Sequence, residues 1–220
     1  MKKRFLLLIF LCSGYFLQAQ LSLAVKGGLS TTSLDPSDFS VIDENGLDEL
    51  LVSLQNARYG IHAGIAIRGT IKERFLIQPE ILFNSNSVDF AITDLNNATT
   101  LIKQEKYQYF DVPLLFGVQF GAFRIHLGPE AHFFVDSISD LSDFDGYQEE
   151  FDTMTLGWLG GIGFDIWNLW LDIRYEGNFT KFGNHIAFYG NSYAFDQAPQ
   201  RLLVSLGFRL LGKKKEKKDF

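Results

Sequence analysis

The stretch 169–181, LWLDIRYEGNFTK, decides the fold. Every second position up to Phe179 is either large and apolar, as at Leu169, Leu171, Ile173, Tyr175 and Phe179, or glycine, as at Gly177. The positions between them are polar, namely Asp172, Arg174, Glu176 and Asn178. Because a β-strand sends alternate side chains to opposite faces, this segment predicts a strand with one apolar and one charged face. In a water-soluble sheet the apolar face points inward, whereas in a barrel surrounded by lipid the charged face does.

The same alternation recurs along the whole chain and predicts eight strands. They cover residues 21–29, 57–68, 74–86, 107–120, 122–134, 154–166, 169–181 and 202–210. Each strand is close to or longer than the 9–11 residues that cross a bilayer at a tilt. The pattern therefore predicts an all-β fold, an eight-stranded antiparallel up-and-down transmembrane β-barrel.

Long and short connections alternate between these strands. The long, polar segments are 34–56, 88–106, 136–152 and 182–199, and the short links lie near 69–73, 120–122 and 167–168. Long loops at one rim and tight turns at the other are typical of outer-membrane barrels, in which the short turns face the periplasm. A soluble lipocalin-like barrel that binds an apolar ligand is the alternative, since it also has eight alternating strands.

The N-terminus predicts export. Lys2, Lys3 and Arg4 precede the apolar run 5–11, and Ala19 offers a small residue at a cleavage point. These features are typical of a secretory signal peptide. The predicted organisation is a signal peptide over 1–19, an outer-membrane barrel over 20–211 and a basic tail over 212–220. Localisation in the bacterial outer membrane, with lipid as the main partner, follows from this organisation.

The polar faces of the strands carry balanced charges among many glycines, as a narrow lumen requires, because buried charges need partners and small residues leave room for long ones. The predicted lumen network consists of Lys26, Arg58, Arg68, Glu80, Asp111, Arg124, Glu130, Asp165, Asp172, Arg174, Glu176 and Arg209. Aromatic residues near the strand ends are expected to form lipid-facing girdles, and these are Tyr59, Trp158, Trp170, Tyr175 and Phe179. Trp170 conflicts with this expectation because it falls in the polar row.

Two details of the strand pairing can be predicted. A two-residue turn at Trp167-Asn168 would pair positions that sum to 335, so that Asp172 faces Gly163 and Arg174 faces Gly161. Prolines interrupt three consecutive strands, at Pro79, Pro113 and Pro129. Because proline cannot donate to the ladder and a closed barrel has no edge strand, β-bulges are expected at these three sites.

Several segments resemble one family, the PorT-like outer-membrane β-barrel proteins of Bacteroidetes-type bacteria. They are the signal-peptide end LQAQ, the first strand AVKGGLSTTS, and the later segments YFDVPLLFGVQF, IHLGPEAHFF and LGWLGGIGFDI. The resemblance implies the barrel fold and the outer-membrane location. It also implies a link to protein secretion, since the family's namesake is linked to the type IX system, but it assigns no functional residues.

An eight-stranded barrel has an interior that side chains just fill, so the sequence predicts a plugged polar lumen and a structural or interaction role rather than an open pore. The long segments 34–56 and 136–152 are rich in Asp and Glu and contain no Lys or Arg. A negatively charged outer rim would repel nucleic acid as a ligand. It favours the binding of cations, or of a protein partner, at the outer loops. The segment 47–57, LDELLVSLQNA, has leucines at helical spacing and is expected to form a helix there.

No cofactor is predicted, with calcium as the open alternative. Within DFDGYQEEFD, a partial EF-hand pattern offers Asp143, Asp145, Glu149 and Asp152, although the first ligand position holds a leucine. Catalysis is not expected. The remaining alternative, a lipid-modifying enzyme at the rim, would need His185 beside Ser192, because His62, His126 and His132 fall in polar rows where structural roles are the default.

Overall fold

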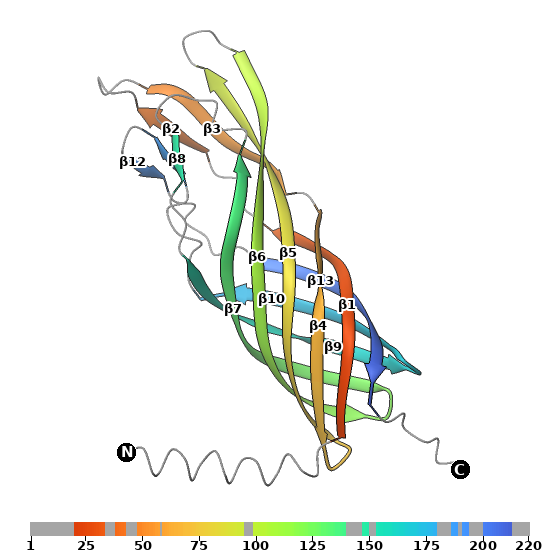
Figure 1. The fold of residues 1–220 in the computed structure, drawn as a ribbon. Helices are drawn as coiled ribbons and strands as arrows, with labels where there is room; N and C mark the ends of the chain where they lie inside the picture. The colour runs from red at the N-terminus through yellow and green to blue at the C-terminus, as the bar shows by residue number, and fades with distance from the viewer. Residues whose placement is uncertain are drawn as a thin grey trace, which may run out of the picture.

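The computed structural model describes residues 20–33, 38–42, 48–57, 59–94, 99–139, 147–149, 153–179, 186–188, 191–193 and 200–212. Eight strands in these ranges form the barrel (Figure 1): β1 (Gln20–Ser33), β4 (Tyr59–Ile71), β5 (Phe75–Asp94), β6 (Thr99–Phe120), β7 (Phe123–Ser139), β9 (Met154–Ile166), β10 (Leu169–Asn178) and β13 (Gln200–Leu211). Each pairs antiparallel with the next barrel strand along the chain, and β1 pairs with β13 to close the barrel. The predicted fold class is therefore confirmed. No helix in the described ranges is long and apolar enough to cross a membrane.

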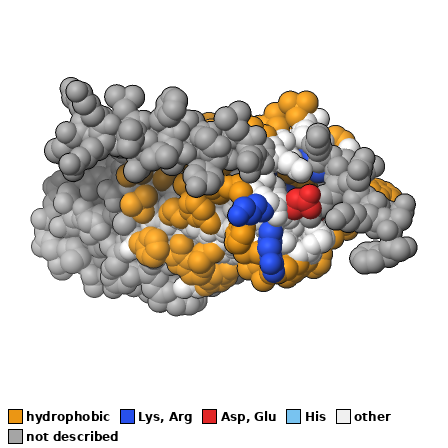
Figure 2. All heavy atoms as spheres, turned by 90° about the horizontal axis from the view of Figure 1, so that it is seen from below, with side chains coloured by type: hydrophobic (Ala, Val, Ile, Leu, Met, Phe, Trp, Pro, Cys, Tyr) orange, Lys and Arg blue, Asp and Glu red, His pale blue; other side chains and the backbone are white. Residues whose placement is uncertain are grey.

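The charged face of the strands points inward and the apolar face points outward. On β10, Ile173 is 42% exposed, whereas Asp172 and Arg174 on either side of it are at most 1% exposed. Leu21, Ile61 and the other large outward residues are exposed in the same way along every barrel strand. Viewed from below (Figure 2), hydrophobic side chains cover most of the described surface, and the few charged groups in view gather near its middle. A soluble barrel of the opposite sense is therefore wrong.

Aromatic side chains lie on the outer surface near the strand ends. Tyr59 is 78% exposed and Phe179 is 71% exposed, and the ring of Trp158 packs 5.8 Å from that of Tyr175. Such rings suit the membrane–water interface. Trp170 departs from this expectation, because it is only 1% exposed and lies inside the barrel.

Three short turns join the barrel strands at the end shown at the bottom of Figure 1. They lie at 72–74, at 121–122 and at Trp167-Asn168, where Trp167 adopts a left-handed φ of 55°. The last turn sets the predicted register, in which Asp172 pairs with Gly163 and Arg174 with Gly161. This register is confirmed.

The three strand prolines do not produce the expected bulges. At or beside Pro79, Pro113 and Pro129 the strand pairing is interrupted for two positions, and the register is the same before and after each interruption. The register shift between β6 and β7 falls instead at Gln108/Tyr109. A proline thus costs its own hydrogen bond without changing the phase of the strand, so that Gln78 and Glu80 on either side of Pro79 both point inward.

Further strands extend the molecule beyond the barrel rim opposite the short turns (Figure 1). The long strands β5 and β6 stay paired up to Asp94 and Thr99, and β3 (Asp48–Ala57) and β2 (Asp38–Ile42) add to the free side of β5. A small separate sheet holds β8 (Tyr147–Glu149), β11 (Ile186–Phe188) and β12 (Asn191–Tyr193). The helix expected over 47–57 is therefore wrong. The overhanging edge of β5 offers backbone hydrogen bonds that an isolated helix would not use.

Candidate functional site

Every barrel strand contributes polar side chains to the lumen. On β10 the side chains of Asp172, Arg174 and Glu176 are each at most 1% exposed. Charges this deeply buried require ionic and hydrogen-bonding partners, since removal from water is costly. The partners come from strands across the barrel and form an inner, a central and an outer group, with the inner group nearest the short turns.

The inner group is centred on Asp165 of β9. Its carboxylate accepts hydrogen bonds from Arg68 (2.8 Å), Arg124 (2.8 Å) and Gln119 (2.9 Å). The guanidinium carbon of Arg68 lies 3.5 Å from the ring centroid of Trp170, a close cation–π contact. This stacking explains why Trp170 occupies the lumen rather than the lipid girdle.

The central group holds two carboxylates between three cations. Glu80 accepts from Lys26 at 3.0 Å and from Arg174 through both of its oxygens, at 2.7 and 2.8 Å. Asp172 contacts Lys26 at 2.9 Å, Arg124 at 2.9 Å and Arg174 at 3.1 Å. Four strands, β1, β5, β7 and β10, are thus joined across the lumen.

The outer group comprises Asn84, Asp111, Glu130, His132, Glu176 and Arg201. Arg201 of β13 bridges Glu176 at 2.6 Å and Asp111 at 2.9 Å. Asp111 also accepts from Asn84 at 2.8 Å and contacts the Nδ1 atom of His132 at 2.7 Å. The Nε2 atom of His132 lies 3.8 Å from Glu176. One arginine therefore serves two carboxylates here.

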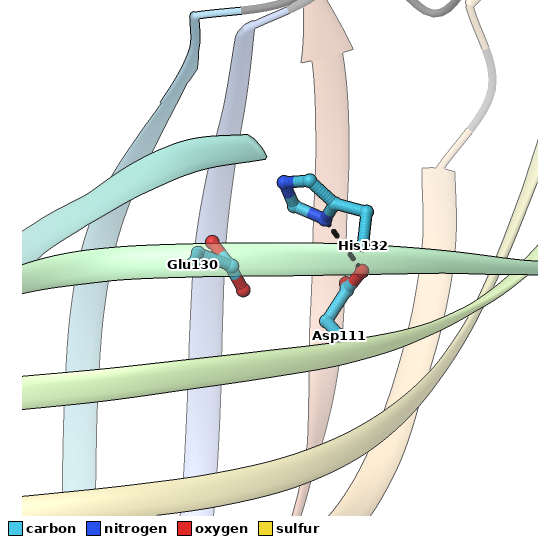
Figure 3. A group of neighbouring side chains, drawn as sticks. All are labelled: Asp111, Glu130 and His132. Carbon is cyan, nitrogen blue, oxygen red and sulfur yellow. Dashed lines mark hydrogen bonds and ion pairs between the residues drawn. The ribbon is translucent and has the colours of Figure 1, made fainter. Parts of the chain in front are cut away.

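Glu130 is the exception in the outer group. Its side chain, next to His132 on β7, is 2% exposed, and neither carboxylate oxygen has a hydrogen-bond partner among the described residues. Potential ligand atoms of Asp111, Glu130 and His132 all lie within 4.8 Å of one another. Figure 3 shows Asp111 joined to His132, with the Glu130 carboxylate beside this pair and bonded to neither. Two carboxylates and an imidazole in one buried group are a set of donors that metal ions use.

Ten of the twelve predicted network residues line the lumen. Arg58 lies outside the described residues. Arg209 is a correction: its guanidinium donates to the carbonyl of Trp167 at 2.7 Å and to Asn168 at 3.0 Å, so it caps a short turn. The position of Arg209 near the end of β13, opposite that turn, explains the difference. Arg201 was missed because the predicted strand began one residue after it, although its parity matches that of Ser205.

The other candidates were a calcium site and an enzyme site. Asp143, Asp145 and Asp152 lie outside the described residues, and Glu149 is described only as part of the backbone of β8. His185 also lies outside them, and Ser192 is placed only as backbone in β12. Calcium binding and the absence of catalysis therefore stay predictions. His62 and His126 lie in the lumen, where His62 contacts the Ser205 hydroxyl at 2.8 Å.

An apolar outer surface, a charged interior and a closed ring of eight strands define a transmembrane β-barrel of the outer-membrane type. The family described as "Outer membrane protein beta-barrel domain" matches residues 16–184, more than half of the chain. The chain belongs to this family and is a protein of the bacterial outer membrane.

Solved structures that match the chain have little sequence in common with it. OprG from Pseudomonas aeruginosa is 15% identical, with a TM-score of 0.53 over 88% of this chain and 97% of OprG. Neisserial surface protein A is 14% identical, with a TM-score of 0.44 over 86% and 95% of the two chains. Ail of Yersinia pestis is 11% identical, with a TM-score of 0.40 over 88% and 99%. No curated protein matches the chain.

Proposed function

We propose that this protein is a closed outer-membrane barrel with a structural and interaction role, rather than a pore. The observation that supports this is the lumen network, in which side chains from all eight barrel strands meet. The central contacts between Glu80, Asp172 and their three cations all measure between 2.7 and 3.2 Å, and these side chains are at most 1% exposed. An ion would have to break several of these buried pairs to pass.

Conductance tests the closed lumen directly. The purified protein, reconstituted in a planar lipid bilayer, is expected to give no stable conductance steps, whereas a general porin in the same lipid gives them. The double variant Asp172→Ala/Arg174→Ala removes the middle of the network and is expected to leak. Ile173→Ala lies on the lipid-facing side of the same strand and should stay silent. Stable steps from the wild-type protein would contradict the proposal.

The interaction role is assigned to the strands beyond the outer rim. The paired strands β5 and β6 have 20 and 22 residues, whereas about 9–11 residues cross a bilayer, so their tip lies outside the membrane. Near this tip Leu101 and Ile102 are 53% and 70% exposed. Exposed apolar side chains away from lipid favour contact with another protein.

Crosslinking in intact cells tests this role. We expect a protein captured by the wild-type chain to be lost from Leu101→Ser/Ile102→Ser and retained by Thr100→Ser, which keeps its hydroxyl beside Thr93. Equal capture by all three chains would contradict a partner site at the tip. Protein secretion, suggested by the resemblance to PorT-like barrels, is the process we propose to examine first, by comparing proteins exported with and without this chain.

A further inference from the structure

The outer group of the lumen has more negative charge than the described residues neutralise. It contains three buried carboxylates, Asp111, Glu130 and Glu176, and one buried arginine, Arg201. The inner and central groups together hold three carboxylates, Glu80, Asp165 and Asp172, and four cations, Lys26, Arg68, Arg124 and Arg174. Arg201 pairs with Asp111 and Glu176, so Glu130 is the carboxylate of this group that has no ion-pair partner among the described residues. With neutral histidine, the outer group has a net charge of −2.

We propose that Asp111, Glu130 and His132 bind one divalent transition-metal ion in the outer half of the lumen. Glu130 is 2% exposed, both oxygens of its carboxylate are without a described partner, and it lies beside the Asp111–His132 pair (Figure 3). A buried carboxyl group without a hydrogen-bond partner holds either a proton or a cation, and an ion of charge +2 would neutralise the outer group. The three side chains already share one region, since their ligand atoms lie within 4.8 Å of one another.

The donor set selects the class of metal. An imidazole nitrogen with two carboxylates suits Zn²⁺ or a related transition metal, whereas Ca²⁺ takes oxygen ligands only. Ligands of a tetrahedral zinc lie about 3.4 Å apart, which follows from bond lengths of roughly 2.1 Å. Glu130 can make this approach because no described hydrogen bond holds its carboxylate. Glu176, whose Oε1 lies 3.8 Å from Nε2 of His132, brings a further carboxylate to the same place.

Direct metal binding tests the site, with Zn²⁺ as the probe. The full protein, purified from outer membranes in detergent and stripped with a chelator, would be dialysed against Zn²⁺ and its bound zinc measured by mass spectrometry. We expect one ion per wild-type chain and at least roughly tenfold weaker binding by Glu130→Gln and by His132→Gln. Substitution of Co²⁺ should give visible d–d absorption in the wild type that both variants lose.

The matched control is His126→Gln, which removes another buried lumen histidine from the same strand, outside the outer group. It should bind zinc as the wild type does. The heat-modified band on SDS gels shows which variants fold. If Glu130→Gln does not fold, it is replaced by Glu130→Asp, which keeps the negative charge. Equal zinc in the wild type and both ligand variants would overturn the proposal. So would a protonated-carboxyl infrared band in the zinc-treated wild type that disappears in Glu130→Gln, because Glu130 then holds a proton instead of a metal.

Discussion

Glycines in the lumen set how closely the charged side chains can pack. A Cβ atom at Gly163 would lie 2.5 Å from both the Arg124 Cζ and the Asp172 Oδ1, two groups that are themselves bonded at 2.9 Å. Gly163→Ala should therefore separate this ion pair and lower the free energy of unfolding by about 1–3 kcal/mol. The check is the urea midpoint of unfolding in lipid, followed by tryptophan fluorescence.

Gly27→Ala is the control for this change. Its Cβ atom would meet nothing nearer than the His62 carbonyl at 3.6 Å, an ordinary van der Waals distance. Alanine here should leave the midpoint unchanged or raise it slightly, since it reduces the freedom of the unfolded chain. If both glycine variants unfolded at the wild-type midpoint, the packing of the central group would be looser than the contacts indicate.

Arg174 contacts both carboxylates of the central group, Glu80 and Asp172. Among the described residues, Arg174→Leu would leave Glu80 with Lys26 and Gln78 as its partners, and breaking a buried pair in this way costs about 3–5 kcal/mol. The compact band on unheated SDS gels should disappear at a lower temperature than in the wild type. Ile173→Leu faces lipid and should leave that temperature unchanged. A reversed result would mean that the lipid face, not the network, holds the barrel together.

Strand parity predicted the lumen better than residue type did. The alternation around Arg174 placed Trp170 inward, and only the preference of tryptophan for interfaces argued for the girdle; the structure follows parity, because Arg68 stacks on the ring. What parity cannot show is which inward residues meet. The bridge from Arg201 to Asp111 joins positions 90 apart in the chain, and the closure of the barrel brings them together.

The barrel strands were predictable because each has a long period-two pattern, whereas the outer extension was not. Segment 47–57 has leucines at positions that fit one face of a helix. It also has apolar residues at every second position from Leu50 to Leu54, which fits one face of a strand. The free edge of β5 decides between the two, since β3 pairs with residues 88–94 of that strand. This edge arises only on folding, when β5 extends beyond the barrel rim and leaves one of its sides unpaired by the barrel.

If β3 is an addition to the barrel rather than part of it, the two should come apart independently. Ser53 pairs with Ala91 of β5 and with Asp38 of β2, and Ser53→Pro removes the backbone N–H of this position from the sheet. Amides of 88–94 that point toward β3 should then exchange faster with deuterium, while peptides from 76–82 inside the barrel stay as protected as before. Ser53→Ala is the control. Faster exchange in both regions would show that the extension and the barrel unfold as one unit.

The arrangement of the whole chain predicts which end of the barrel faces the cell exterior. At the end with the short turns, Gln20 at the start of β1 pairs with Thr70, just before the 72–74 turn. The amide of Arg209 near the end of β13 donates to the Asn168 carbonyl of another short turn at 2.8 Å. An even number of strands thus brings both ends of the barrel to the side of the short turns, which in outer-membrane barrels is the periplasm.

Epitope tags test this orientation. Tags inserted at Asn45 and at Gly146 belong to the long connections and should be stained on intact cells, because these connections follow strands that end at the opposite rim. A tag after Phe220 should be stained only after the outer membrane is permeabilised. All tagged variants contain the same barrel, so the heat-modified band on SDS gels shows whether each of them has folded. Staining of the C-terminal tag on intact cells would reverse the assigned orientation, and it would place the β5–β6 tip with Leu101 and Ile102 in the periplasm.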